Sequence, residues 1–217
     1  MIRFTNVSKH FKTQNHKKII LDKCNIEFHR GYSYGILGVN GAGKSTTMKM
    51  IAGTIIPNSG NISKDLRVSW PLGFAGGFNN DMTGKENLNF VARAYGEDVS
   101  RVSRFVEEFA ELGDYINAPY RTYSSGMAAR LAFGLSMAIQ FDCYLVDEIT
   151  AVGDARFQER CREAFDQRRK NSDMIMISHG METIKNYCDK ALLLVDGRMI
   201  FYDDVEHAIE AYYRLNR

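Results

Sequence analysis

The segment Gly38-Val39-Asn40-Gly41-Ala42-Gly43-Lys44-Ser45 fills every fixed position of the phosphate-binding loop G-x-x-x-x-G-K-[ST], between a predicted strand and a predicted helix. The glycines let successive backbone N–H groups face the phosphates of a nucleotide, Lys44 supplies a cation, and the Ser45 hydroxyl can join a Mg²⁺ shell. The alternative is a glycine turn with a solvent-facing lysine, which the flanking elements disfavour. We therefore predict that phosphate is bound by Gly38, Asn40, Gly41, Ala42, Gly43, Lys44, Ser45 and Thr46.

Two carboxylates end a second apolar segment, Tyr144-Leu145-Val146-Asp147-Glu148. A doubly wound sheet binds its ligand at the edge where such strands end. Because successive strand side chains point to opposite faces, Asp147 is predicted to hold Mg²⁺, directly or through water, and Glu148 to polarise the attacking water. Taken alone, the pair is equally typical of a strand end whose acids face solvent or cap the next turn. Its combination with the phosphate loop favours catalysis.

A second run of small residues, Ser124-Ser125-Gly126, stands at the head of an apolar helix, 79 residues after Ser45 and 23 before Asp147. A helix start offers free backbone N–H groups and the positive end of the helix dipole, so this run is also predicted to bind phosphate. Two phosphate-binding faces on one short chain indicate either two ligands or one nucleotide shared between two copies of the chain.

Two single side chains are further candidates. His179 follows the apolar segment that ends at Ile177, and a neutral imidazole at this sheet edge is expected to orient the γ-phosphate and the water. A lone histidine in such a place is more often structural or at the surface. Phe11 is a candidate to stack on adenine, although an exposed or core phenylalanine is the commoner case.

The composition is that of an ordinary soluble globular chain. Of 217 residues, 45% are hydrophobic and 25% charged, and the net charge of +2 gives no basis for predicting nucleic-acid binding. The aliphatic runs fall far short of the roughly 20 residues that span a bilayer, and residues 1–7 lack a secretory signal, so we expect a cytosolic chain. The cysteine spacing suits neither disulfides nor zinc, which favours buried free thiols at Cys24, Cys143, Cys161 and Cys188.

The order of predicted elements indicates an α/β fold with a P-loop core, a parallel sheet and an N-terminal antiparallel β part. Strands are expected at 2–7, 19–28, 32–37, 66–70, 143–146 and 174–177, with a hairpin at 191–202. Helices are expected at 44–52, 83–95, 102–112, 155–170, 181–188 and 205–217, and from residue 124 onward. We predict a single domain over residues 1–217, with a helical subdomain inserted at about 83–140.

Over essentially its whole length, the chain resembles the nucleotide-binding subunit of an ATP-binding cassette (ABC) transporter. The family signature Leu-Ser-Gly-Gly-Gln corresponds to residues 123–127, of which only Ser124 and Gly126 match, and residues 151–154 occupy the loop after the catalytic glutamate. The branch of the family that exports bacterial capsular polysaccharide is closely similar in residues 70–73 (WPLG), 90–93 (FVAR), 105–113 (FVEEFAELG), 122–127 (TYSSGM) and 152–157 (VGDARF).

The resemblance implies an ABC ATPase fold and ATP hydrolysis with Mg²⁺, in which Glu148 and His179 are catalytic and Ser45 and Asp147 hold the metal. It implies a homodimer with ATP between the P-loop of one copy and residues 124–126 of the other. The implied partners are integral membrane channel subunits and further periplasmic export components. The implied substrate is an acidic, lipid-linked polysaccharide rather than nucleic acid, and the implied location is the cytoplasmic face of the bacterial inner membrane.

One departure from the family concerns the loop after residue 70. The family normally has a glutamine there that reaches Mg²⁺ and water, whereas residues 73–78 read Gly-Phe-Ala-Gly-Gly-Phe. Glycines beside Phe74 and Phe78 favour a flexible segment with an apolar anchor for a membrane partner, against the alternative of a plain surface loop.

Two other functions are open to the sequence. One is export of another glycan, such as O-antigen or teichoic acid; the chain ends too soon after His179 for the carbohydrate-binding domain that some O-antigen exporters carry. The other is a soluble cassette ATPase acting on DNA, ribosomes or iron–sulfur assembly. Such relatives usually add coiled coils, a second cassette or another domain, and 217 residues leave no room for them.

Overall fold

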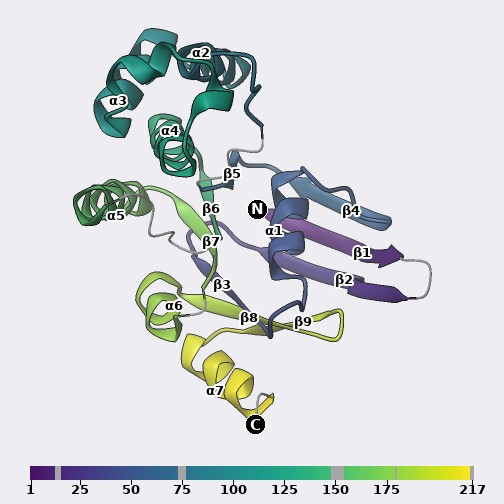
Figure 1. Cartoon of the computed structure of the whole chain (residues 1–217). Helices are drawn as coiled ribbons and strands as arrows, with labels where there is room; N and C mark the ends of the chain where they lie inside the picture. Colours follow the sequence, from purple (N-terminus) through teal and green to yellow (C-terminus); the bar gives the residue numbers. More distant parts are fainter. Residues whose placement is uncertain (13–15, 73–76, 148–153, 179, 216–217) are drawn as a thin grey trace. The chain divides into compact units, whose positions relative to one another are not determined.

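A computed structural model describes residues 1–12, 16–72, 77–147, 154–178 and 180–215 of the chain (Figure 1). The strands are β1 (Ile2–Lys12), β2 (Lys17–Phe28), β3 (Tyr34–Leu37), β4 (Ser59–Lys64), β5 (Val68–Pro71), β6 (Cys143–Asp147), β7 (Asp173–Ile177), β8 (Lys190–Val195) and β9 (Arg198–Tyr202). The α-helices are α1 (Lys44–Ala52), α2 (Gly84–Ala94), α3 (Val99–Ala110), α4 (Ser125–Ala138), α5 (Ala155–Arg169), α6 (Met181–Tyr187) and α7 (Val205–Leu215).

These elements form two compact units, of which the first comprises residues 1–71, 142–149 and 172–217. It contains an antiparallel sheet of order β2-β1-β4 and a six-stranded sheet of order β5-β6-β7-β3-β8-β9. The six strands pair in parallel except β9, which runs antiparallel to β8. The predicted parallel sheet and N-terminal antiparallel part are confirmed. β4 was missed because its polar residues suggested a turn, yet they pair with β1 along the exposed edge of the small sheet.

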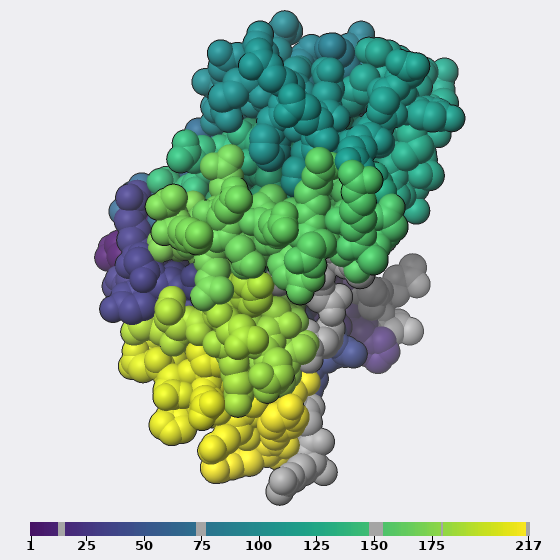
Figure 2. Space-filling view, turned by 90° about the vertical axis from the view of Figure 1, so that its left-hand side faces the viewer, coloured from purple at the N-terminus to yellow at the C-terminus, as the bar shows by residue number. Residues whose placement is uncertain are grey.

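The core of this unit gathers around α1, which contacts β2 of the small sheet and β5, β6 and β7 of the large one. Tyr34 and Ile36 of β3 belong to this core, whereas the intervening Gly35 faces α6, where an added Cβ would lie 2.8 Å from Ile184 Cγ2. Since neighbouring strand residues point to opposite faces, α1 and α6 cover opposite faces of the large sheet. In Figure 2, α6 and α7 lie side by side (yellow-green and yellow).

The second unit comprises residues 72–141 and 150–171. Its helix α2 begins with the predicted capping box: Thr83 Oγ1 accepts from the Glu86 N–H at 3.1 Å, and Glu86 Oε2 accepts from the Thr83 N–H at 2.7 Å. Helix α4 packs on α3 and on α5. The insertion expected at 83–140 falls within this unit, which also includes α5. The single domain over residues 1–217 stays a prediction.

Two expectations from composition can be compared with the structure. The four cysteines are buried free thiols, as predicted, and burial raises the pKa of Cys161 to about 12. Among the described helices, none has both the length and the apolar character needed to cross a bilayer.

Candidate nucleotide site

The phosphate loop joins β3 to α1 and is shaped by two glycines. Gly41 and Gly43 have φ angles of 79° and 109°, which side chains rarely allow. A Cβ on Gly43 would also lie 2.5 Å from Ile20 Cγ2, so β2 packs directly against the loop. Helix α1 then begins without a side-chain cap, which leaves the N–H groups of its first turn and its positive dipole end at the loop.

A cavity of about 380 Å³ opens beside this loop and collects most of the predicted site residues. Eight of its lining residues were predicted from the sequence: Phe11, Asn40, Gly41, Gly43, Lys44, Ser45, Thr46 and Asp147. Gly38 and Ala42 belong to the same loop but do not line the cavity. Three lining residues were missed: Lys18, Ile20 and Ile177. Among the described residues, the lining of the cavity therefore combines backbone N–H groups, two ammonium groups, hydroxyls and one carboxylate.

Lys44 is the buried cation of the loop, with 7% of its surface exposed. Its ammonium donates to the Gly38 carbonyl at 2.7 Å and to the Val39 carbonyl at 3.2 Å. These two hydrogen bonds hold the Lys44 side chain along the loop, beside the space that the phosphates would occupy. The group is therefore positioned to meet a polyphosphate with little side-chain entropy left to lose.

The half-buried Asp147 ends β6 and lies in register with Ile177 of β7, so the cavity lies at the carboxyl ends of parallel strands, as predicted. Ser45 lines the same cavity from the first turn of α1. A hydroxyl and a carboxylate are the oxygen donors that suit Mg²⁺. Glu148 and His179, which follow these strands in the sequence, lie outside the described residues.

Phe11 stands at the cavity on β1, 44% exposed, and pairs across the hairpin with Lys18 of β2. The ammonium of Lys9 lies 5.0 Å from the centroid of the Phe11 ring. An exposed ring beside a phosphate loop can stack on a nucleotide base. Lys18 was missed because the sequence pattern started this strand at Ile19, whereas hydrogen-bonded pairing extends β2 back to Lys17.

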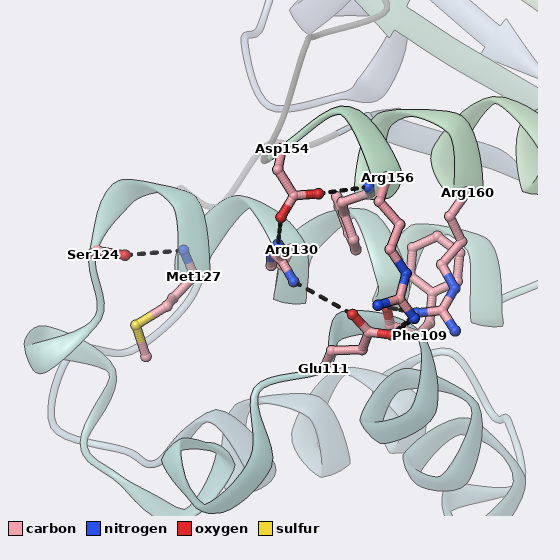
Figure 3. A network of polar contacts seen from close by, with 9 residues as sticks. Phe109, Glu111, Ser124, Met127, Arg130, Asp154, Arg156 and Arg160 are labelled. Carbon is pink, nitrogen blue, oxygen red and sulfur yellow. Dashed lines mark hydrogen bonds and ion pairs between the residues drawn. The ribbon is translucent and has the colours of Figure 1, made fainter.

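The second predicted phosphate-binding face lies in the other compact unit, at the start of α4. Ser124 is the N-cap, and its hydroxyl accepts from the Met127 N–H at 3.2 Å (Figure 3). Ser125 and Gly126 form the first turn, whose N–H groups have no partner within a helix. The segment thus has the geometry of an anion-binding helix start.

A network of charged side chains ties α4 to α5 and to the end of α3 (Figure 3). Arg130 of α4 donates to Asp154 at 3.0 Å, and its guanidinium lies 4.5 Å from the centroid of the Phe157 ring. Asp154 caps α5 by accepting from the Phe157 N–H at 2.9 Å, and this bond, together with Arg130, lowers the pKa of Asp154. Glu111 pairs with Arg130, Arg156 and Arg160.

Sequence reasoning missed this network because its members come from three helices that only the tertiary fold brings together. The one local signal was the segment 152–157, which includes the capping Asp154.

Comparison with known proteins agrees with this geometry. The pattern of the family described as "ABC transporter" matches residues 21–151. The chain is 48% identical to the polysialic acid transport ATP-binding protein KpsT of Escherichia coli, over 98% of both chains. It is 44% identical to the capsule polysaccharide export ATP-binding protein CtrD of Neisseria meningitidis, over 99% of this chain and 100% of the relative. Relatives named as exporters of teichoic acids, in Staphylococcus haemolyticus, and of O-antigen, in Klebsiella pneumoniae, are 34% and 33% identical.

Among solved structures, a dimeric post-hydrolysis state of an ATP-binding cassette bound to ADP and Pi superposes with a TM-score of 0.74. The match covers 92% of this chain and 96% of that one at 19% identity, which shows the fold. The matched family and the near-full-length relatives lead to one conclusion. The chain belongs to the ABC transporter family and is an ATP-binding subunit that hydrolyses ATP.

Proposed function

We propose that the chain drives export of a capsular polysaccharide across the bacterial inner membrane. The observation that carries this proposal is its near-full-length similarity to KpsT and CtrD, at 48% and 44% identity. The ATP-binding subunit would act at the cytoplasmic face, on channel subunits in the membrane, and alongside periplasmic export components. An acidic, lipid-linked glycan is the proposed cargo.

The cavity supports a specific division of roles in ATP hydrolysis. Residues 38–46 would hold the phosphates through backbone N–H groups and Lys44, while Phe11 stacks on the base. Ser45 and Asp147 would hold Mg²⁺, which neutralises charge on the phosphates when bound. Glu148 would polarise the attacking water, and His179 would orient the water and the γ-phosphate.

The helix start at Ser124 supports a shared site. In a homodimer, the N–H groups of residues 124–126 would face the γ-phosphate of ATP held by the partner's P-loop. Each copy would then supply one half of two composite sites, so hydrolysis would require the dimer.

The loop after β5 is the proposed contact with the channel subunit, through Phe74 and Phe78. Phe74 lies outside the described residues. Phe78 is half-buried, and its ring centroid lies 5.1 Å from that of Tyr120 in an edge-on arrangement. Because Phe78 also packs within its own unit, Phe74→Ala tests the contact more cleanly than a change that includes both rings.

Export of O-antigen or teichoic acid is the alternative, and a host test separates it. In a capsulated strain that depends on this chain, Lys44→Ala should remove surface capsule and leave polymer in the cytosol, with O-antigen or teichoic acid at normal levels. Lys17→Ala, an exposed lysine outside the cavity, is the matched control. Loss of O-antigen or teichoic acid with intact capsule would reject capsule as the cargo. Co-purification and mass spectrometry of the membrane partner would reject a soluble, non-transport ATPase.

A further inference from the structure

A second lysine reaches the nucleotide cavity from outside the phosphate loop. Lys18 of β2 lines the cavity together with Phe11, its pairing partner on β1. Its ammonium nitrogen lies 3.3 Å from the position that a Cβ would take on Gly41. The charge of Lys18 therefore lies beside the phosphate loop itself.

The backbone of β2 determines this placement. Ile20 packs on Gly43 of the loop, whereas Ile19 packs on the other side, 2.9 Å from the Cβ position of Gly197. Alternation along a strand puts Lys18 on the face of Ile20 and Lys17 on the face of Ile19. Two adjacent, exposed lysines thus differ in one respect, which is whether they face the cavity.

The two lysines of the cavity also differ from each other. The ammonium of Lys44 is engaged by two loop carbonyls. Within the part of the chain that the structure describes, the ammonium of Lys18 has no hydrogen-bond or ion-pair partner. An exposed ammonium beside a loop of inward N–H groups adds to the positive potential there, and it can donate to an anion that binds at the loop.

We infer that Lys18 is a second phosphate-binding cation of the ATP site, contacting the polyphosphate from β2. This inference rests on ATP binding at the P-loop, as in the proposed function. The Lys18 ammonium then contributes to nucleotide affinity in proportion to the charge of the phosphate chain. Its contribution therefore increases from adenosine to ADP to ATP.

The test is calorimetric titration of the full chain with Mg-ATP, ADP and adenosine. Lys18→Gln should weaken ATP binding about tenfold, the effect of one charge-assisted hydrogen bond, with a smaller effect on ADP and none on adenosine. Lys18→Arg should stay within about threefold of wild type, because the charge is kept. Lys17→Gln is the matched control and should stay within about twofold, because its charge faces away from the cavity.

Salt provides a second measurement. ATP affinity should fall less steeply with added salt in Lys18→Gln than in wild type, because one exposed charge is missing. Unchanged ATP affinity in Lys18→Gln, or equal losses in Lys18→Gln and Lys17→Gln, would overturn the inference. Wild-type protein that binds no ATP would instead refute the proposed function. Thermal unfolding of both variants checks that folding is intact, which their exposed positions favour.

Discussion

The two regions proposed to contact ATP are built by different physical means. The phosphate loop is a backbone structure held by packing: Gly43 lies directly under Ile20, and the Lys44 ammonium is buried against loop carbonyls. The start of α4 is an ordinary capped helix end, on a helix that a partly exposed charged network around Arg130 and Glu111 ties to its neighbours. The phosphate loop therefore has little room for an added side-chain atom, whereas the start of α4 has more room.

This difference accounts for how far each motif departs from its family pattern. The phosphate loop retains every fixed position, whereas the signature retains two of five residues, Ser124 and Gly126. A Cβ on Gly126 would meet nothing closer than the Ser124 hydroxyl at 3.9 Å, so the helix start needs its cap and its N–H groups more than it needs glycine. The groups proposed to bind phosphate at α4 belong to the backbone, and many side chains leave them available.

The first prediction removes the proposed base. Glu148→Gln should lower ATP turnover by roughly 10²-fold or more while leaving ATP binding intact, because the amide cannot accept the proton of the attacking water. Single-turnover hydrolysis measured with the membrane partner present, beside ATP binding, checks both parts. Near-normal turnover would falsify the assignment.

The second prediction separates the two regions. Lys44→Ala should weaken ATP binding itself, because a cation over the phosphates is lost. Ser124→Arg should abolish hydrolysis yet keep ATP binding, because Ser124 is proposed to face the partner's nucleotide. Ser124→Ala controls for the lost helix cap, which is worth about 1 kcal/mol of stability. Weak ATP binding by Ser124→Arg alone would contradict the shared site.

Mixed dimers sharpen the same test. A dimer of one Lys44→Ala chain and one Ser124→Arg chain keeps one composite site free of both changes, and partial hydrolysis is expected. Dimers carrying the same change in both copies have no such site. If the mixed dimer is as inactive as the dimers that carry one change in both copies, there are two explanations: the site is not shared, or the two sites act only together. A mixed dimer of wild type with Ser124→Arg distinguishes these explanations.

The third prediction compares glycines. Gly43→Ala should destabilise the fold by about 1–3 kcal/mol, because the added Cβ meets Ile20 at 2.5 Å and φ is 109°. Gly126→Ala should be neutral or stabilising by up to about 1 kcal/mol, since alanine favours helix and the space is open. Urea unfolding of both variants provides the comparison. Equal losses of stability would mean that the two regions are equally constrained.

The sequence predicts the parts of the site whose chemistry is local, and it misses the parts that depend on contacts between distant segments. The phosphate loop and Asp147 were predictable because their chemistry is local: glycine dihedrals, a strand end and a helix start within a few residues. Lys18 was not, since its place at the cavity depends on how far β2 pairs with β1 and which face it presents. Arg130 was not, because its partners Glu111 and Asp154 come from other helices. The missed β4 shows that a polar edge strand has no apolar alternation to reveal it.

The smallest expected effect tests the charged network. The Phe157 N–H and then Arg130 hold the pKa of Asp154 below its ordinary value of 3.8. A carboxyl with a depressed pKa adds stability above its unfolded pKa and loses it as the pH falls through the folded value. Asp154→Asn keeps an acceptor for the cap but carries no charge.

Wild type should therefore be slightly more stable than Asp154→Asn at pH 7, with a gap that is constant to about pH 5 and shrinks below about pH 4. Urea unfolding across this range measures the gap, and Asp154→Ala, which also loses the cap, should be the least stable of the three at pH 7. Repeating the comparison in an Arg130→Met background should reduce the gap, because one of the groups that stabilise the charged carboxylate is gone. A gap that stays constant down to pH 3.5 would mean that the Asp154 charge contributes nothing, and that hydrogen bonding alone holds α5 at its start.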